Sequence, residues 1–182
     1  MPPKERRSTM HGDFMPAPEL WILAGPNGAG KTTAVQRLPI VSTLPEVAFI
    51  NPDDRTLRKL IAAGYAGFAE TPSQLLDRLF LESANEVAEE LKTKINFNEA
   101  VGVETVLSTD KYHSLVEWVR GRGGFFGLIY IALTAPEIAM ARVANRVVQS
   151  GHGVPGDKIV QRWKRSLERL PWFAANATRF EP

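Results

Sequence analysis

The chain has 182 residues, of which 44% are apolar and 23% are charged, and its formal net charge at pH 7 is +2. These values are ordinary for a single globular domain and argue against wholesale disorder. Because the sequence contains no cysteine, it excludes a disulfide scaffold, a thiol nucleophile and a Cys-ligated metal centre. The near balance of charges does not by itself indicate a nucleic-acid partner, and we do not expect one.

The first eighteen residues differ in composition from the rest. Residues 1–18 hold prolines and charges without a hydrophobic period, which predicts a flexible arm before a single domain at 19–182. No apolar segment follows the early basic residues, so we expect no secretory signal. The longest apolar stretch, 127–135, is shorter than the ~18–20 residues of a membrane span. We therefore expect a cytoplasmic protein without a membrane partner.

From Glu19 onward, short apolar runs alternate with segments of helical period, which predicts an α/β fold with a mainly parallel sheet. We expect strands at 20–25, 46–50, 100–103 and 125–133. We expect helices at 31–38, 56–63, 72–95, 109–121, 134–150 and 157–170. Pro171 should end the last helix, because proline disrupts a helix interior.

A phosphate-binding loop is the most specific motif. Residues 25–32, GPNGAGKT, match G-x-x-x-x-G-K-[ST] between an expected strand and an expected helix. In such a loop, backbone N–H groups and the helix N-terminus bind phosphate, the lysine bridges the outer phosphates, and the hydroxyl ligates Mg²⁺. The motif therefore predicts a site for ATP and Mg²⁺, with Thr32 as the metal ligand. The predicted nucleotide-binding residues are Gly25, Pro26, Asn27, Gly28, Ala29, Gly30, Lys31, Thr32 and Thr33.

Acidic residues follow the second and third expected strands, at the sheet edge where such folds bind ligands. Asp53 and Asp54 follow the second strand, and Glu104 follows the third. In a kinase, one carboxylate accepts the proton of the attacking hydroxyl and another helps to hold Mg²⁺. The alternatives are a helix N-cap, favoured for Asp54 over Asp53, and a solvated strand end for Glu104.

Basic residues mark the last two helices. Arg142 and Arg146 lie four residues apart and share a face, and Lys158, Arg162, Arg165 and Arg169 form a stripe on the last helix. The glycine-containing segment 151–155 joins the two helices, so we expect a helical basic lid over about 135–170 that contacts the nucleotide through Arg142, Arg146 and Arg162. The alternative is a solvated face with surface ion pairs.

Five segments in order, GPNGAGKTT, FINPDD, VETVLST, PEIAMARVANRVVQSGHGVP and RWKRSLERL, resemble the zeta toxin family over about residues 19–171. The resemblance implies a P-loop kinase fold that phosphorylates the amino sugar of UDP-N-acetylglucosamine with ATP and Mg²⁺, and it admits an antitoxin partner. By motif position it implies that Asp53 is the general base. It likewise implies an acidic site residue at Glu104, the Walker A pair at Lys31 and Thr32, and a γ-phosphate contact at Arg146.

The chain also departs from the family. A second lid arginine of the family falls near His152 here, so its role passes to Arg162 or Arg165. Val106 stands where the toxins carry a sugar-binding threonine, and no strand is expected after the last helix.

The leading hypothesis is an ATP-dependent kinase with catalytic residues Asp53, Lys31, Glu104 and Arg146, acting on a hydroxyl of a small molecule. A nucleic-acid end kinase and a non-catalytic nucleotide-dependent switch are the alternatives.

Overall fold

The computed structural model describes residues 17–37, 47–148 and 156–181, without the side chains at 35–37, 146–148 and 180–181. Residues 1–16 of the expected N-terminal arm and the loop at 151–155 therefore lie outside the described residues. Five parallel strands form one sheet in the order β2-β3-β1-β4-β5. They are β1 (Glu19–Ala24), β2 (Phe49–Ile50), β3 (Ala100–Thr105), β4 (Phe125–Tyr130) and β5 (Arg179–Glu181).

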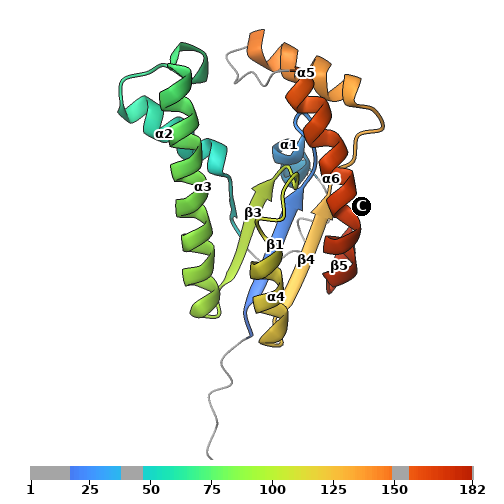
Figure 1. Cartoon of the computed structure of the whole chain (residues 1–182). Helices are drawn as coiled ribbons and strands as arrows, with labels where there is room; N and C mark the ends of the chain where they lie inside the picture. The colour runs from blue at the N-terminus through green and yellow to red at the C-terminus, as the bar shows by residue number, and fades with distance from the viewer. Residues whose placement is uncertain (1–16, 38–46, 149–155, 182) are drawn as a thin grey trace, which may run out of the picture.

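Helices connect the strands and cover the sheet. They are α1 (Lys31–Arg37), α2 (Pro52–Ala62), the short 3-10 helix η2 (Phe68–Glu70), α3 (Ser73–Asn96), α4 (His113–Gly121), α5 (Pro136–Val148) and α6 (Gly156–Asn176). In Figure 1, α4 and α6 lie in front of the sheet and α1 lies behind it, while α2 and α3 pair beside β3. The parallel α/β fold expected from the alternating pattern is confirmed.

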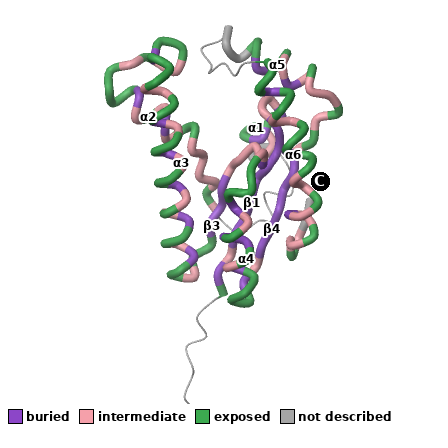
Figure 2. Tube along the Cα trace, in the orientation of Figure 1, coloured by how far each residue is buried: buried purple, intermediate pink, exposed green. Residues whose placement is uncertain are grey.

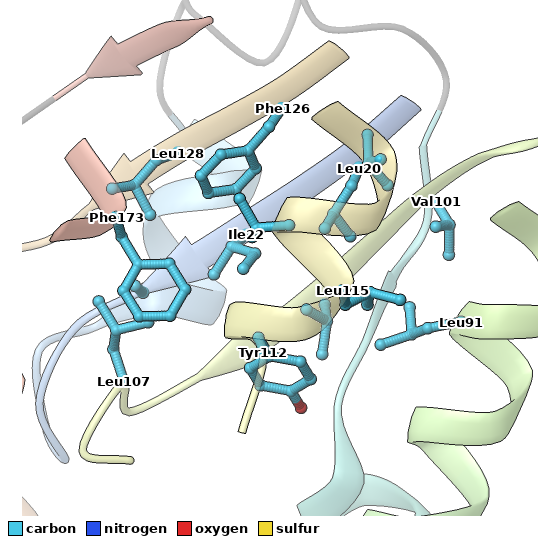
Figure 3. Packing of buried hydrophobic residues seen from close by; sticks show 14 of the residues in the cluster. Leu20, Ile22, Leu91, Val101, Leu107, Tyr112, Leu115, Phe126, Leu128 and Phe173 are labelled. Carbon is cyan, nitrogen blue, oxygen red and sulfur yellow. The ribbon is translucent and has the colours of Figure 1, made fainter. Parts of the chain in front are cut away.

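The main core lies between the sheet and α3, α4 and α6 (Figure 2). Every residue of β1 from Leu20 to Ala24 is buried, as expected for a central strand that is covered on both faces. Figure 3 shows Leu20, Ile22, Phe126 and Leu128 of the sheet facing the helical residues of this core, with Phe173 of α6 among them. Burial of this layer fixes the strands whose ends form the site.

The topology places the site at one edge. The chain runs from β1 outward to β2 and returns to β3, and then crosses to β4 and β5 on the other side of β1. The carboxyl end of β1 is therefore the point where the strand order reverses, which is where parallel α/β sheets bind ligands. Residues that follow β1, β2 and β3 meet at this edge.

The end of the chain differs from the expectation. The last helix does not stop at Pro171 but continues to Asn176, and β5 follows it and pairs with β4. Phe173 is fully buried against Phe126, and Trp172 stacks on His113 with ring centroids 3.8 Å apart. This packing offsets the cost of about 3 kcal/mol that a proline imposes within a helix.

Other boundaries also differ: α2 begins at Pro52 rather than at residue 56, and β2 begins at Phe49 rather than at residue 46. The helix α4 begins at His113, without a side-chain cap from Thr109 or Asp110, and β4 ends at Tyr130 rather than at Leu133.

Candidate active site

The loop at residues 25–30 turns tightly between β1 and α1. Gly25 has φ +149°, and a Cβ atom there would lie 2.4 Å from the Ile131 carbonyl oxygen. Gly28 has φ +72°, and its Cβ would lie 2.9 Å from the Ala139 carbonyl oxygen. Both positions therefore require glycine, because β4 and α5 approach the loop backbone. This is the geometry expected of a loop whose N–H groups surround a phosphate.

Lys31, Thr32 and Glu104 form one polar cluster beside the loop. The Lys31 ammonium donates to the carbonyl oxygens of Gly25 and Pro26, at 2.9 and 3.2 Å, and lies 3.9 Å from Glu104 Oε1. The Thr32 hydroxyl donates to Glu104 Oε2 at 3.3 Å. The structure thus brings the two Walker A side chains together with the acidic residue of the next strand. The Glu104 side chain is 14% exposed, so the solvated strand end is wrong.

The charge on Glu104 is held in an unfavourable environment. Burial raises the pKa of Glu104, and Asp54 and Asp53 raise it further, while Lys31 and the Thr32 hydroxyl lower it. Desolvation outweighs the attraction of a single ammonium at 3.9 Å. A carboxylate in this state gains from any cation that binds beside it.

The residues after β2 begin a helix and present two carboxylates. The Asn51 side chain caps α2 by accepting from the Asp53 backbone N–H at 2.9 Å, and Pro52 occupies the first helical position. The N-cap expected at Asp54 is therefore wrong: Asn51 caps, and both aspartates lie exposed in the first turn. Proline is common at this position because it has no N–H to satisfy.

A cavity of about 550 Å³ joins these groups. Most of its lining is polar or belongs to the phosphate loop and the turn after β2: Asn27, Gly28, Lys31, Thr32, Asn51, Pro52, Asp53, Asp54, Glu104, Thr105 and Arg162. The remaining lining residues are Leu57, Ile61, Ala66, Gly67, Phe68 and Val106, which we call the apolar wall. The cavity thus combines a phosphate loop, three carboxylates and a guanidinium with a wall that sequence reasoning missed. A signal existed, since Leu57 and Ile61 follow Asp53 at steps of four on α2.

Tyr112 is a residue of the main core whose phenol is influenced by the charge of Asp53. It is 4% exposed, and burial, followed by the negative charge of Asp53, raises its pKa to about 12. The phenol therefore stays protonated throughout the physiological range and places a dipole near Asp53.

The basic residues of the expected lid are not all in the site. Arg162 of α6 lines the cavity. The Arg142 guanidinium instead donates to the Gly28 carbonyl oxygen at 3.2 Å, which ties α5 to the phosphate loop. Arg165 is exposed and is not among the residues that line the cavity. The Arg146 side chain and His152 lie outside the described part of the structure.

The oxygens at the site fit Mg²⁺. The hydroxyl of Thr32 and the carboxylate of Glu104 are adjacent hard donors of the kind that bind this ion or its waters. In the described residues, no group of three or more His, Asp or Glu side chains could hold a metal without further ligands. Phosphate oxygens and waters are the usual other ligands of Mg²⁺ at such sites.

The family model for the zeta toxin matches residues 5–178. The chain belongs to the zeta toxin family. This confirms the resemblance drawn from the five ordered segments, and with it the P-loop fold. Among proteins of curated function, none matches the chain.

Solved structures share the fold at low sequence identity. The PezAT toxin–antitoxin system of Streptococcus pneumoniae contains a chain that is 18% identical to this protein, with a TM-score of 0.59. The match covers 90% of this protein and 65% of the PezAT chain. The structure of AvrRxo1-ORF1:-ORF2 with ATP contains a chain that is 17% identical, with a TM-score of 0.61; the match covers 88% of this protein and 50% of the AvrRxo1 chain. The Pnkp1/Rnl/Hen1 RNA repair complex contains a chain that is 16% identical, with a TM-score of 0.61; the match covers 88% of this protein and 48% of the chain in the complex.

This protein therefore spans about half the length of the matched chains in the AvrRxo1 and Pnkp1 structures. Together the matches show a P-loop kinase fold. Within the described residues, none of the helices has the length and apolar character needed to cross a bilayer.

Proposed function

We propose that the protein is an ATP-dependent phosphotransferase that moves the γ-phosphoryl group to a hydroxyl of a small molecule. One observation carries the proposal: a complete phosphate loop opens into the same cavity as the carboxylates of Asp53 and Glu104. Family membership supports a kinase, and it suggests a UDP-amino sugar such as UDP-N-acetylglucosamine as the first acceptor to test. An antitoxin protein is the partner that we propose on the same basis.

The residues have separable roles in this reaction. The loop N–H groups and Lys31 would bind the phosphates, and Arg162, which lines the cavity, would neutralise charge on the γ-phosphoryl oxygens. Thr32 and Glu104 would hold Mg²⁺, directly or through water. When bound, Mg²⁺ neutralises charge on the β- and γ-phosphates.

Asp53 is proposed as the general base. The acceptor oxygen forms a bond to the γ-phosphorus, the bond from phosphorus to the β–γ bridging oxygen breaks, and ADP leaves. The hydroxyl proton passes to the Asp53 carboxylate, which lines the cavity, while the Asn51 cap holds the Asp53 backbone N–H. An arginine such as Arg162 over the transferred group is worth ~10³–10⁵ in rate in related phosphoryl transfers.

A mass-spectrometric screen tests the function. The protein is incubated with Mg²⁺, ATP and a panel of sugars, nucleotide sugars, nucleosides and oligonucleotides, with Lys31→Ala as the control. We expect one small hydroxyl compound to gain a phosphoryl group with the wild-type protein only. ATP hydrolysis without any phosphorylated acceptor would contradict the proposal. Phosphorylation of an oligonucleotide end would show that the acceptor is a nucleic acid and not a small molecule.

A further inference from the structure

The apolar wall of the cavity lies beside the carboxylates but has no part in binding phosphate. Leu57 and Ile61 follow Asp53 along α2, and Phe68 and Val106 border the same cavity. Ile61 is 57% exposed, although a large apolar side chain at the surface of a cavity gains free energy when it is covered. The wall is therefore a surface that a ligand can bury.

The wall has a defined shape. The Phe68 and Phe80 rings are nearly parallel, with centroids 5.6 Å and planes 4° apart, so packing on α3 fixes the orientation of Phe68. Leu57, Phe68 and Val106 are all partly buried. A surface that is held in place loses little conformational entropy when a ligand covers it.

Ion pairs hold α2, which carries Leu57 and Ile61, against α3. Arg55 pairs with Glu86 and Glu90, and Lys59 pairs with Glu82 and Glu86. The distances from Asp53 to Leu57 and Ile61 are therefore set by one helix that is held against α3.

The helix geometry gives the length of the ligand. A helix rises 1.5 Å per residue, so Leu57 and Ile61 lie roughly 6 and 12 Å along α2 from Asp53. If the reacting hydroxyl of a molecule lies at Asp53, a group that the molecule carries about 6–12 Å away lies over Leu57 and Ile61.

We propose that the acceptor is a hydroxyl compound that carries a planar, apolar ring about 6–12 Å from the reacting hydroxyl, and that Ile61 and Phe68 determine this preference. The inference rests on the proposed function, because it takes the Asp53 end of the cavity to be the reacting end. It excludes small polyols and simple sugar acids as preferred acceptors, since these would leave the apolar wall uncovered.

A pair of probes with the same sugar tests the preference. Methyl glucoside and 4-nitrophenyl glucoside differ only in the group attached to the sugar, and their binding to the full chain is measured by ligand-observed NMR with Mg²⁺ and a non-hydrolysable ATP analogue present. We expect the 4-nitrophenyl probe to bind about tenfold more tightly, because its ring buries apolar surface. Equal binding of the two probes, or no binding of either, would overturn the proposal.

Variants locate the effect. Ile61→Ser and, as a second variant, Phe68→Ser should each remove most of the difference between the probes. Leu81→Ser is the matched control, because Leu81 is an apolar residue of α3 that is 65% exposed and does not line the cavity. It should keep the tenfold difference. The same difference in Ile61→Ser and in Phe68→Ser would refute the assignment.

The nucleotide is measured separately by calorimetry with the same variants. Weaker binding of the ATP analogue to Ile61→Ser would assign the wall to the base of the nucleotide and overturn the proposal. Failure of the wild-type protein to bind the analogue at all would instead contradict the proposed kinase function. The two failures are therefore distinguishable.

Discussion

Asp53 and Asp54 stand side by side in the first turn of α2, but only one of them is proposed to remove a proton. The Asp53 backbone N–H is tied to the Asn51 side chain, and the charge of Asp53 acts on the buried Tyr112 phenol. Both carboxylates line the cavity beside the phosphate loop, and Asp53 is the one that matches the general base of the family by motif position. Neither aspartate caps the helix, so replacing either by asparagine should disturb stability little.

Asp53→Asn should therefore lower kcat by about 10²–10⁴ on a true acceptor, since the amide cannot accept the proton. Its melting temperature and its affinity for Mg·ATP should remain close to those of the wild-type protein. Asp54→Asn is the matched control and should retain most turnover. Steady-state kinetics with thermal melts would check this, and equal losses in both variants would contradict the assignment of Asp53.

Glu104 shows the cost of a buried charge at the site. Burial raises its folded-state pKa above the ordinary value of 4.5, so the folded protein binds this proton more strongly than the unfolded chain does. Stability therefore falls as pH rises through the interval between the unfolded and folded pKa values, and the full cost is present above that interval. Lys31 would keep two carbonyl acceptors without Glu104.

Glu104→Gln should accordingly raise the melting temperature of the ligand-free protein at pH 7, on the order of 1–3 °C, while phosphoryl transfer falls. The gain should shrink as pH falls from the folded-state pKa toward 4.5 and disappear below 4.5, where Glu104 becomes neutral in both states. Thermal melts of both proteins across this pH range would check the sign. A variant that is less stable at pH 7 would show that the pair with Lys31 outweighs desolvation.

A buried hydrogen bond sets the position of α6 on the sheet. The Tyr130 hydroxyl of β4 and the Ser166 hydroxyl of α6 lie 2.9 Å apart, and both residues are almost fully buried. Ser166 follows Arg162 by four residues, so this contact lies one helical turn from the guanidinium that lines the cavity. The bond thus connects the packing of α6 to the site.

Tyr130→Phe should cost about 1–3 kcal/mol in the free energy of unfolding, because the Ser166 hydroxyl is left buried without this partner. Adding Ser166→Ala should cost less than the sum of the two single changes, since the double variant leaves neither hydroxyl unsatisfied. Urea unfolding of the four proteins measures the coupling. Additive losses would mean that the two hydroxyls stabilise the fold independently.

The sequence predicted these elements unevenly. The run at 20–25 and the loop GPNGAGKT were readable, because strand, turn and helix signals agree over a short span. Ser166 was not predicted as a buried position of α6, because its burial depends on Tyr130, which is distant in the sequence. The neighbouring apolar residue Leu167 is 36% exposed. Likewise, α6 passes through Pro171 because Phe173 packs on β4, a contact that local propensity does not contain.

The site was predictable in part for the same reason. Motif spacing located Lys31, Thr32, Asp53 and Glu104, and the structure places all four at one cavity. The cap at Asn51 could have been read from Pro52, which favours the first position of a helix. Phe68 could not be assigned, because its place depends on the packing of η2 against α3.

Across the whole molecule, the cavity lies between two groups of helices. The helix α2 and the adjoining η2 supply the apolar wall, while α6 supplies Arg162 from the other side (Figure 1). The phosphate loop after β1 is bonded to α5, because the Arg142 guanidinium donates to the Gly28 carbonyl oxygen, and α5 in turn contacts α6. A nucleotide bound at the loop would therefore contact a segment that is connected to α5 and α6.

We expect Mg²⁺ and a non-hydrolysable ATP analogue to slow amide exchange in the loop and α1 and also in the first turns of α2 and α6. Ligand at a hundred times its Kd stabilises the folded state by about 2.7 kcal/mol, so amides that exchange through opening of the site should slow by up to about 100-fold. The helix α4 is the internal reference, because none of its residues lines the cavity. Lys31→Ala should abolish the change. Protection confined to the loop, with α2 and α6 unaltered, would show that the two sides do not close on the nucleotide.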